Sequence, residues 1–519
     1  MTIANNPILK GFYPDPSICR VGKDFYIVTS SFVYAPGVPI FHSRDLAHWE
    51  QIGHVLETEE QLKVSGDISD GIYAPTIRYH DGLFYMITTN VSYGGNFIVT
   101  AENPEGPWSK PYYLGDDAPG IDPSLFFDDD GRCYYVGTRP NPSGVCYNGD
   151  WEIWVQELDL KSMKLIGESA AIWKGAVKDV IWPEGPHIYK KDGYYYLLHA
   201  EGGTGPEHSI SVARSKDIFK WFEGCPRNPI FSHRNLGKDY PIIYAGHGDL
   251  VDDENGNWYV VMLASRQCEK HCSMGRETFL AKVIWEDGWP VISPGIGRLE
   301  DKVEIPLETV RFSEENQWND VIHFFDNTLD QRLVGIEKRN ESIYSLEDRK
   351  GYLRLFAKQN RIEDEGYPAY LGLRQKDYSF EAGCGVEFEP KTNKDAAGLV
   401  LFQNSKNNLR MLVCNVEGKK VLRVSEWVKG KEINKKDYNL SSDGLLEIKL
   451  RAKNQHGQIW IKEGNTNAYV CVAEDVNLLA YTTEEAGGFV GCTIGMYAAS
   501  DSDDTYADFA WLSFLKDEN

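Results

Sequence analysis

One pattern recurs along this 519-residue chain and indicates its fold; a clear copy is Ile121-Asp-Pro-Ser-Leu-Phe-Phe-Asp-Asp-Asp-Gly-Arg-Cys-Tyr-Tyr-Val136. A polar residue in a tight turn precedes an apolar strand, an Asp-Gly-like turn follows, and the next strand is rich in aromatic residues. The five starts are Asp15-Pro-Ser-Ile, Ala74-Pro-Thr-Ile, Asp122-Pro-Ser-Leu, Glu184-Gly-Pro-His and His247-Gly-Asp-Leu. A period of roughly 50 to 60 residues filled with short strands is typical of a β-propeller. The sequence therefore predicts an all-β fold that begins with a five-bladed β-propeller.

The starts of the five repeats share a place that bears on function. Because each start opens the innermost strand of its copy, all five are expected to meet at one mouth of the central channel. Three of them are carboxylic acids: Asp15, Asp122 and Glu184. A single acidic residue in a turn is more often a cap or an Asx-turn. Three acids at equivalent places in the repeat instead predict a group of carboxylates at this mouth.

The second half of the chain has a different strand pattern. The repeat ends in the Gly- and Pro-rich stretch Ser293-Pro-Gly-Ile-Gly297, and short alternating strands return after it, at 352–356, 381–388, 398–402, 446–450 and 507–511. Alternation with frequent turns is typical of a β-sandwich. We therefore expect a propeller over residues 1–300, a linker over 301–320 and a jelly-roll, concanavalin-like sandwich over 321–519. No long helix is expected.

The charge balance of the chain limits its partners. Lysine and arginine number 54 against 77 aspartates and glutamates, which gives a formal net charge of −23. Such an acidic surface repels phosphate backbones and anionic lipid, so we expect neither nucleic acid nor a membrane as a partner. A neutral ligand fits better. Aromatic residues make up 13% of the chain, which suits the packing of blades and also the stacking of sugars.

Other features of the chain bear on its compartment. The N-terminus has no basic segment followed by a long apolar run, as a secretory signal would, and no stretch is apolar enough to span a membrane. The ten cysteines are scattered without paired spacing, as in a reducing compartment. These observations favour the cytoplasm. The sequence predicts no oligomeric state.

Two clusters in the sequence resemble metal sites in part. Cys268-x-x-His271-Cys272 has zinc-ligand residue types, but no fourth ligand is evident, so zinc is disfavoured. Asp501-Ser-Asp-Asp504 and Asp508 carry hard oxygen ligands of the kind that calcium prefers. A solvated acidic turn is the favoured interpretation of this second cluster.

Grouped carboxylates are suited to acid–base chemistry. Each one raises the proton affinity of its neighbours, so one can stay protonated while another remains an ionised base. Cleavage of a glycosidic bond needs this division, because one group protonates the leaving oxygen and another acts at the anomeric carbon. Where water is the nucleophile, the two carboxyl groups lie roughly 6.5 to 9.5 Å apart.

Several motifs of the chain resemble those of a known family. The chain is similar to glycoside hydrolase family 43, the five-bladed enzymes that act on arabinose- and xylose-containing glycans, and the second half resembles the C-terminal sandwich of that family's β-xylosidase-like members. The motifs that carry the resemblance are Phe12-Tyr-Pro-Asp-Pro-Ser17, His42-Ser-Arg-Asp-Leu-Ala-His-Trp49, Ile121-Asp-Pro-Ser124, Trp182-Pro-Glu-Gly-Pro186, Glu201-Gly-Gly-Thr-Gly205 and Gly275-Arg-Glu-Thr278.

The resemblance implies a role for each carboxylate in an inverting, single-displacement hydrolase. Asp15 would be the general base that activates water, Glu184 the general acid, and Asp122 the residue that tunes the pKa of Glu184 and holds its orientation. Arg276 would hydrogen-bond the terminal sugar, although from the sequence alone it could equally form a surface ion pair with Glu277.

The resemblance also implies walls for a pocket that holds the terminal sugar. Phe32 and Tyr73 match apolar walls, although close relatives often have tryptophan at Tyr73, which leaves the substrate preference open. Phe489 matches a sandwich residue that closes the side of the pocket, so the sandwich is expected to contribute to the active-site wall; the alternative is a core phenylalanine at a strand end. A closed pocket admits only a chain end.

His247 matches a histidine that, in many relatives, lies beneath the carboxylates and orients water around a central calcium or similar cation. Its alternative is a buried, hydrogen-bonded histidine. No cofactor is needed for the chemistry, so an ion near His247 would be structural or electrostatic.

The leading functional hypothesis is an exo-acting α-L-arabinofuranosidase, with or without β-D-xylosidase activity, that acts on arabinoxylan or xylo-oligosaccharides. A dedicated β-D-xylosidase is the alternative. A non-catalytic carbohydrate-binding propeller would not need a protonated glutamic acid opposite an ionised aspartate, and a propeller that serves protein assembly would expose apolar faces in place of an acidic mouth.

Overall fold

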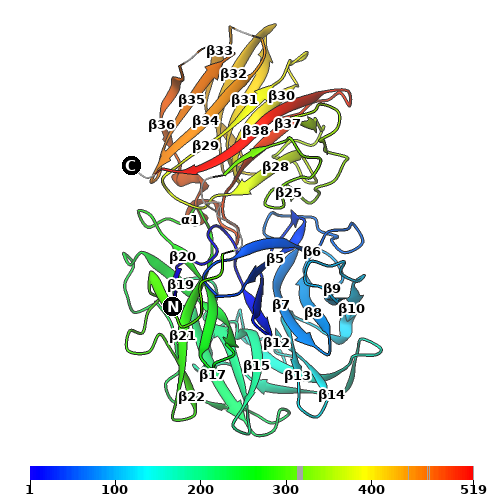
Figure 1. Cartoon of the computed structure of the whole chain (residues 1–519), viewed down its shortest axis with the longest axis vertical. Coiled ribbons are helices and arrows are strands. Elements are labelled where there is room, and N and C mark those ends of the chain that lie inside the picture. The colour runs from blue at the N-terminus through cyan, green and yellow to red at the C-terminus, as the bar shows by residue number, and fades with distance from the viewer. Residues whose placement is uncertain (312–319, 442, 465, 467, 518–519) are drawn as a thin grey trace.

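The computed structural model of the chain describes residues 1–311, 320–441, 443–464, 466 and 468–517. It consists of two β-rich parts, with the C-terminal part lying above the N-terminal part in Figure 1. Within the described residues the only α-helix is α1 (Thr483–Ala486), and two 3-10 turns, η1 (Gly115–Asp117) and η2 (Leu479–Tyr481), complete the helical content. The prediction of an all-β fold without a long helix is confirmed. The described part of the chain contains no helix that is long and apolar enough to cross a membrane.

Five four-stranded antiparallel sheets form the N-terminal part. In chain order they are β2 (Ser17–Val21), β3 (Asp24–Val28), β5 (Gly37–Ser43) and β6 (Glu50–Leu56); β7 (Ile72–His80), β8 (Leu83–Asn90), β9 (Gly95–Ala101) and β10 (Tyr112–Tyr113); β11 (Ile121–Phe127), β12 (Cys133–Pro140), β13 (Trp151–Asp159) and β14 (Lys164–Trp173); β15 (Glu184–Lys191), β16 (Tyr194–Glu201), β17 (Ser209–Ser215) and β18 (Glu223–Gly224); and β19 (Ile242–Asp252), β20 (Trp258–Arg266), β21 (Glu277–Glu286) and β22 (Trp289–Ile292).

The first strands of these sheets contact one another in a closed ring. Strand β2 contacts β7, β7 contacts β11, β11 contacts β15, β15 contacts β19, and β19 returns to β2. Each sheet corresponds to one sequence repeat, and the ring is the arrangement of blades in a β-propeller. One sheet alone could not bury both of its faces, and the ring buries the inner strands of all five.

The backbone at the start of each first strand explains why the starts are alike. Asp15, Ala74, Asp122, Gly185 and His247 all have positive φ, between 29° and 56°. The ladder is bulged at this point in four of the sheets, between Tyr73 and Thr76, Ile121 and Ser124, Glu184 and His187, and Gly246 and Gly248. Glu184 is therefore one residue ahead of the place held by Asp15 and Asp122. The prediction of three equivalent acids is right for two of them and wrong for Glu184, which occupies the place of Tyr73.

A buried polar cluster ties four of the five sheets together around the channel. The Asp249 carboxylate accepts hydrogen bonds from Arg78 Nη1 and Nη2 at 2.8 and 3.1 Å, from Ser17 Oγ at 2.7 Å and from the Tyr189 hydroxyl. Burial would raise the pKa of Asp249, but Arg78 outweighs it and holds the pKa well below the usual value. Sequence analysis did not single out Asp249 or Arg78.

Replacement of Asp249 with asparagine should destabilise the protein by about 3–5 kcal/mol, because it leaves the Arg78 guanidinium buried without its counter-charge. Urea unfolding of the variant measures this loss. Asp252→Asn is a matched control on the same strand, since its ion pair with Arg20 is 41% exposed on the aspartate side and should contribute less than about 1 kcal/mol. Equal losses in the two variants would contradict the role given to the Asp249 cluster.

Two antiparallel sheets form the C-terminal sandwich. One contains, in spatial order, β26 (Tyr344–Ser345), β27 (Leu353–Phe356), β38 (Tyr506–Lys516), β29 (Phe380–Glu387), β34 (Leu446–Lys453), β35 (His456–Glu463) and β36 (Val470–Asn477), with β24 (Asp320–His323) also paired to β38. The other contains β28 (Ala369–Arg374), β37 (Thr493–Ala499), β30 (Ala396–Asn404), β31 (Asn407–Val416), β32 (Lys419–Val428) and β33 (Lys431–Asn439). A single apolar core lies between them.

Short strand pairs join distant parts of the chain. β1 (Thr2–Asn5) pairs with β23 (Lys302–Ile305), so part of the segment predicted as a linker over 301–320 forms a strand; residues 312–319 of that segment lie outside the described residues. β4 (Tyr34–Ala35) pairs with β25 (Gly335–Ile336), which hydrogen-bonds the first blade to the sandwich. The boundaries proposed from the sequence place this second pair across the two domains.

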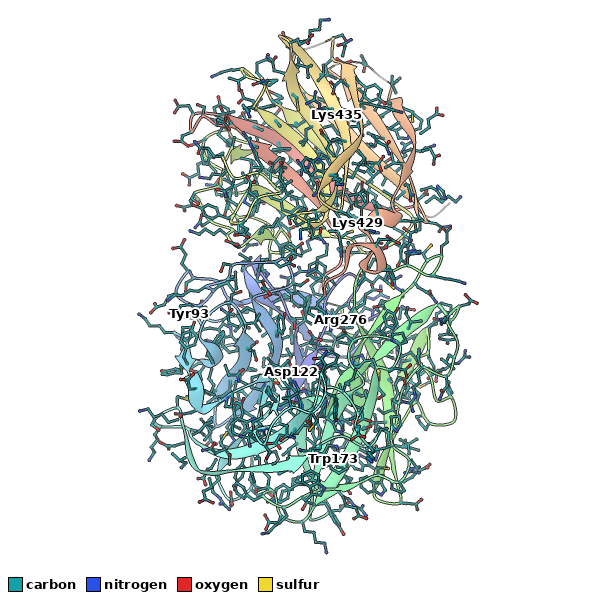
Figure 2. The ribbon with its side chains drawn as sticks, turned by 180° about the vertical axis from the view of Figure 1, so that it is seen from behind. Tyr93, Asp122, Trp173, Arg276, Lys429 and Lys435 are labelled. Atoms are coloured by element: carbon teal, nitrogen blue, oxygen red, sulfur yellow. The ribbon has the colours of Figure 1, made fainter. Side chains whose placement is uncertain are left out.

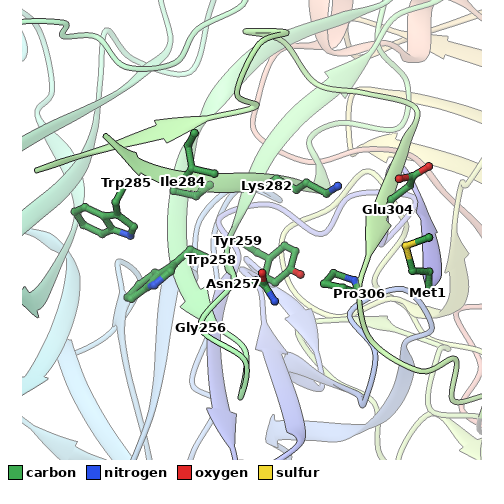
Figure 3. Close-up of a pocket in the computed structure, with 11 residues that line it drawn as sticks. Met1, Gly256, Asn257, Trp258, Tyr259, Lys282, Ile284, Trp285, Glu304 and Pro306 are labelled. Atoms are coloured by element: carbon green, nitrogen blue, oxygen red, sulfur yellow. The ribbon is translucent and has the colours of Figure 1, made fainter. Parts of the chain in front are cut away.

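A surface pocket of about 390 Å³ lies beside the β1–β23 pair (Figure 3). Tyr259 and Lys282 are cross-strand partners that line it together with Pro306, Glu304 and Met1. Trp258 and Trp285 lie to one side of these residues in Figure 3, and Trp285 packs against Tyr196 at 4.9 Å between ring centroids. The indole rings are therefore part of the packing of neighbouring blades. None of the predicted site residues lines this pocket.

Candidate active site

Asp15 lies at the start of the first blade, with its side chain almost completely buried. Arg276 Nη1 donates to Asp15 Oδ1 at 2.9 Å, and Ser30 Oγ donates to Asp15 Oδ2 at 2.6 Å. Burial alone would raise the pKa of Asp15, but the Arg276 guanidinium, with smaller contributions from His247 and Ser30, holds the pKa below its usual value. Asp15 is therefore held as an ionised carboxylate with both oxygens engaged.

Asp122 and Glu184 have the opposite tendency. Burial raises the pKa of Asp122 to about 6, and the negative charge of Asp15 adds to this rise. Burial also raises the pKa of Glu184 well above its usual value, and the charges of Asp122 and Asp15 raise it further. The charge on Asp122 thus affects the protonation of Glu184. The site thus holds an ionised acid, Asp15, beside a carboxyl group that retains its proton, as acid–base catalysis requires.

Backbone contacts fix the mutual position of Asp122 and Glu184. The N–H of Gly185 donates to Asp122 Oδ2 at 3.1 Å, so Asp122 is hydrogen-bonded to the residue that follows Glu184. A Cβ atom on Gly185 would lie 2.8–3.0 Å from three atoms of the His247 ring, so the glycine is required by this close approach as well as by its φ of 56°. Asp122 and His247 thereby determine where the Glu184 side chain leaves the backbone.

Arg276 belongs to the site and not to the surface. It is 8% exposed and pairs with Asp15, while Glu277 pairs with Arg266 at 2.6 Å. The alternative of an Arg276–Glu277 surface ion pair is therefore wrong. Arg276 Nε has no hydrogen-bond partner among the described residues, which leaves this buried N–H free to donate to a bound ligand. In Figure 2, Arg276 lies near the side of the propeller that faces the sandwich, and Asp122 lies further toward the propeller's centre.

Three aromatic side chains predicted as pocket walls come together from three parts of the fold. Phe32 and Tyr73 contact edge to face at 5.7 Å between ring centroids, and Phe489 lies 6.4 Å from Phe32 and 6.2 Å from Tyr73. Phe489 is 38% exposed and its ring lies 5.6 Å from the Arg276 guanidinium carbon. It is thus an outward-facing residue of the sandwich, and the alternative of a buried core phenylalanine is wrong.

Two serines that sequence analysis did not single out hold these groups in place. Ser30 Oγ accepts the N–H of Ala74 at 2.7 Å in addition to its bond with Asp15. Ser69 Oγ accepts the N–H of Phe489 at 2.9 Å, and the Ser69 carbonyl accepts the Tyr73 hydroxyl at 2.8 Å. The only signal in the sequence was the position of each serine close to a predicted wall residue.

His247 lies beside the carboxylates, with Nδ1 3.8 Å from Asp15 Oδ1. Within the described parts of the chain there is no group of three or more His, Cys, Asp or Glu side chains arranged to hold a metal ion. The protein side chains near His247 therefore do not form a direct-ligand site, and an ion there would have to be held largely by water. Calcium near His247 stays a prediction.

The two other candidate metal clusters have structural partners. Cys268 and His271 pair through their backbones in a turn, and the Cys272 N–H donates to the Glu484 carboxylate at 2.7 Å. Asp508 is buried in ion pairs with Arg354 and Arg349 at 2.8 and 3.1 Å, which occupy the oxygens that calcium would need. The disfavoured zinc and calcium interpretations of these clusters gain no support.

Family models match both parts of the chain. The model for glycosyl hydrolases family 43 matches residues 4–290, and the model described as beta xylosidase C-terminal concanavalin A-like domain matches residues 321–515. The two matches leave out the segment 291–320 between them. They agree with the all-β propeller and sandwich described above.

Curated and solved relatives match over nearly the full length. A xylosidase/arabinosidase of Butyrivibrio fibrisolvens is 66% identical, with 99% of each chain covered. A non-reducing end alpha-L-arabinofuranosidase of Bacteroides ovatus is 37% identical over 98% of this chain and 94% of its own. The crystal structure of a xylan beta-1,4-xylosidase from Bacillus halodurans has a TM-score of 0.92 at 35% identity, and covers 99% of this chain and 100% of its own. With its carboxylate site and both matched domains, the chain belongs to the glycosyl hydrolases of family 43.

Proposed function

We propose that the protein is an inverting, exo-acting glycoside hydrolase that removes terminal α-L-arabinofuranosyl residues from arabinoxylan oligosaccharides, with or without β-D-xylosidase activity. The observation that carries the proposal is a group of carboxyl groups in which Arg276 pairs with Asp15 at 2.9 Å, while no ion pair among the described residues engages Glu184. Asp15 is held ionised by Arg276, and Glu184 is held protonated by burial and by its acidic neighbours. This is the division of labour that acetal cleavage needs.

In this mechanism Glu184 donates its proton to the leaving glycosidic oxygen. Asp15 accepts a proton from a water molecule that attacks the anomeric carbon from the opposite face in the same step. Asp122 keeps the pKa of Glu184 high through its charge and orients the Gly185 backbone through its hydrogen bond. Arg276 orients Asp15 and offers its free Nε–H to a hydroxyl group of the terminal sugar.

The aromatic walls support action at a chain end. Phe32 is completely buried and Tyr73 is partly buried, and Phe489 closes the space between them from the sandwich side. Apolar rings of this kind pack against the C–H faces of a sugar, while the carboxylates and Arg276 bind its hydroxyl groups. A pocket walled on these sides accepts one terminal pentose, so we propose exo action.

Two features of the chain and its relatives bear on the choice between arabinose and xylose. Relatives of this chain carry both activities in their names, as xylosidase/arabinosidase, arabinofuranosidase and xylosidase. Tyr73 stands where close relatives often have tryptophan, and we take this difference to favour the arabinofuranosidase. A dedicated β-D-xylosidase is the second candidate, favoured by the C-terminal domain model that matches residues 321–515.

The substrate preference can be tested with parallel initial rates on 4-nitrophenyl α-L-arabinofuranoside and 4-nitrophenyl β-D-xyloside. We expect kcat/KM to be higher on the arabinoside, with measurable hydrolysis of the xyloside. A higher kcat/KM on the xyloside would reverse the preference and leave the hydrolase proposal intact. Release from neither substrate nor from arabinoxylan oligosaccharides would favour a binding protein in place of an enzyme.

A further inference from the structure

The sandwich contains a buried arginine that has no counter-charge in the described part of the chain. Arg374 is the last residue of β28 and is only 1% exposed. Its Nε, Nη1 and Nη2 atoms form no hydrogen bond with any described residue. A buried charge in this condition lowers the stability of a protein, so its presence calls for an explanation other than stability.

The aromatic rings that the Arg374 guanidinium contacts lie in the other domain. Its guanidinium carbon is 4.7 Å from the centroid of the Phe12 ring and 4.5 Å from that of Tyr13, which are distances of cation–π contacts. Both rings are buried. The chain around them is tightly packed: a Cβ atom on Gly11 would lie 2.8 Å from the Gln375 carbonyl oxygen and 3.3 Å from Arg374 Cβ.

Phe12 and Tyr13 closely precede Asp15, the candidate base, in the sequence. The sequence continues through Pro14 to Asp15, and Tyr13 is hydrogen-bonded to the segment that holds Arg276 and the start of β21. The Tyr13 N–H donates to the Arg276 carbonyl at 3.1 Å, and Thr278 Oγ1 donates to the Tyr13 carbonyl at 2.6 Å. The two segments are thus joined twice, by the backbone bonds of Tyr13 and by the side-chain bond from Arg276 to Asp15.

A second contact from the end of β28 reaches the segment that precedes Arg276. Gln375, the next residue after Arg374, donates from Nε2 to Ser273 Oγ at 3.0 Å. Cys492 also contacts Ser273, since the Cys492 N–H donates to the Ser273 carbonyl at 2.7 Å. The end of β28 therefore contacts the chain just before Arg276 as well as the chain just before Asp15.

We propose that Arg374 is a positioning residue through which the sandwich holds the Asp15–Arg276 pair in its reactive arrangement. Arg374 itself touches neither substrate nor the reacting atoms; it acts through the rings of Phe12 and Tyr13. The inference rests on the proposed role of Asp15 as the base. It gives the sandwich a second task, at the back of the site, that is separate from the wall formed by Phe489.

Arg374→Met is the decisive variant, because methionine keeps a flexible, unbranched stem and has no charge. We expect an unchanged or higher melting temperature, since an unpaired buried charge is removed. We also expect kcat on 4-nitrophenyl α-L-arabinofuranoside to fall about 10-fold with little change in KM, because a displaced base slows the chemical step. Arg374→Lys keeps a cation near the rings and should retain more of the kcat.

The pH dependence separates positioning from a purely structural role. Asp15 is surrounded by Arg276, His247, His208, Asp122 and Glu184, and Arg276 is the group that most lowers its pKa. If the Arg276 contact loosens, the pKa of Asp15 rises, so the acid limb of the kcat/KM profile should move to higher pH. An unmoved acid limb in Arg374→Met overturns the inference, whether or not kcat falls. If the methionine variant does not fold, the same criterion applies to Arg374→Gln, which also has no charge.

Arg410→Met is the matched control. Arg410 is also buried in the sandwich and lies over a ring, 4.0 Å from the centroid of Trp427, but it is paired with Glu363 at 2.9 Å. Its replacement should lower the melting temperature and leave kcat and the acid limb unchanged, the reverse of the Arg374 pattern. If Asp15→Ala abolishes hydrolysis while Arg374→Met has wild-type kcat and acid limb, only the positioning inference fails. If Asp15→Ala remains active, the proposed function fails first.

Discussion

Replacement of Glu184 with glutamine is expected to slow the hydrolysis of xylo-oligosaccharides and arabinoxylan oligosaccharides by about 10³-fold, within the range typical of a lost general acid. Glutamine has nearly the same shape but cannot donate the proton that the sugar leaving group needs. The loss on 4-nitrophenyl glycosides should be smaller, about 10- to 100-fold, because nitrophenolate leaves with little protonation. Initial rates on both kinds of substrate measure the difference.

The pH profile of the same variant provides a second readout. The pKa of Glu184 is raised, so in the wild-type enzyme activity falls as pH rises through that value and the acid loses its proton. Glu184→Gln should therefore lose the alkaline limb and keep the acid limb, which reports Asp15. Glu207→Gln, a change at an exposed glutamate of the same blade, is the control and should leave rates and both limbs unchanged. Equal losses on the two substrate types would argue against Glu184 as the acid.

The local sequence was sufficient to predict the propeller because each blade is built from neighbouring segments. The turn, apolar strand, turn and aromatic strand of a repeat are contiguous, so their pattern is visible along the chain, as at Asp122 to Val136. The same pattern was aligned one residue wrongly at Glu184. The letters Glu-Gly-Pro resemble Asp-Pro-Ser only loosely, and the positive φ of Gly185 is what identifies the equivalent position.

Contacts between the domains could not be predicted from the residues alone. Ser69 binds the Phe489 N–H across 420 positions of sequence, and Arg374 reaches Phe12 and Tyr13 from the sandwich. No local pattern marks a serine or an arginine for such a contact, because its partner is fixed only by how two separate bodies pack. Phe489 was predicted through the family resemblance, because family members share the way their two domains pack. The resemblance gave no such expectation for Ser69 or Arg374.

The buried electrostatics of the site also depend on three-dimensional packing. The sequence placed Asp15, Asp122 and Glu184 near one another but did not order their pKa values. Arg276 contacts Asp15 at 2.9 Å and lowers its pKa. Its effect on the pKa of Glu184 is smaller than that of burial and of the two aspartates, which raise this pKa. The directions of the pKa shifts are compatible with the roles that the family resemblance implies, and the assignment of the base to Asp15 stays a prediction.

Asp15→Ala is expected to abolish measurable hydrolysis of 4-nitrophenyl glycosides and oligosaccharides alike, with a loss of about 10³-fold or more in kcat. The base activates water whatever the leaving group, so a good leaving group cannot compensate, unlike in Glu184→Gln. Initial rates on the two substrate types test this. Asp81→Asn is the control, since Asp81 lies in a turn with its side chain 91% exposed and should have no effect on rate. Full activity of Asp15→Ala without an added nucleophile would remove Asp15 from the role of base.

The stereochemistry of the product then distinguishes a base from a nucleophile at Asp15, because loss of either would stop turnover. If Asp15 activates water for direct attack, the wild-type enzyme releases a pentose whose anomeric configuration is inverted relative to the substrate. A covalent intermediate on Asp15 would instead give retention through two inversions. Proton NMR of the first product formed, recorded before mutarotation, separates the two. Inversion together with the loss in Asp15→Ala on both substrate types leaves activation of water as the role that accounts for both results.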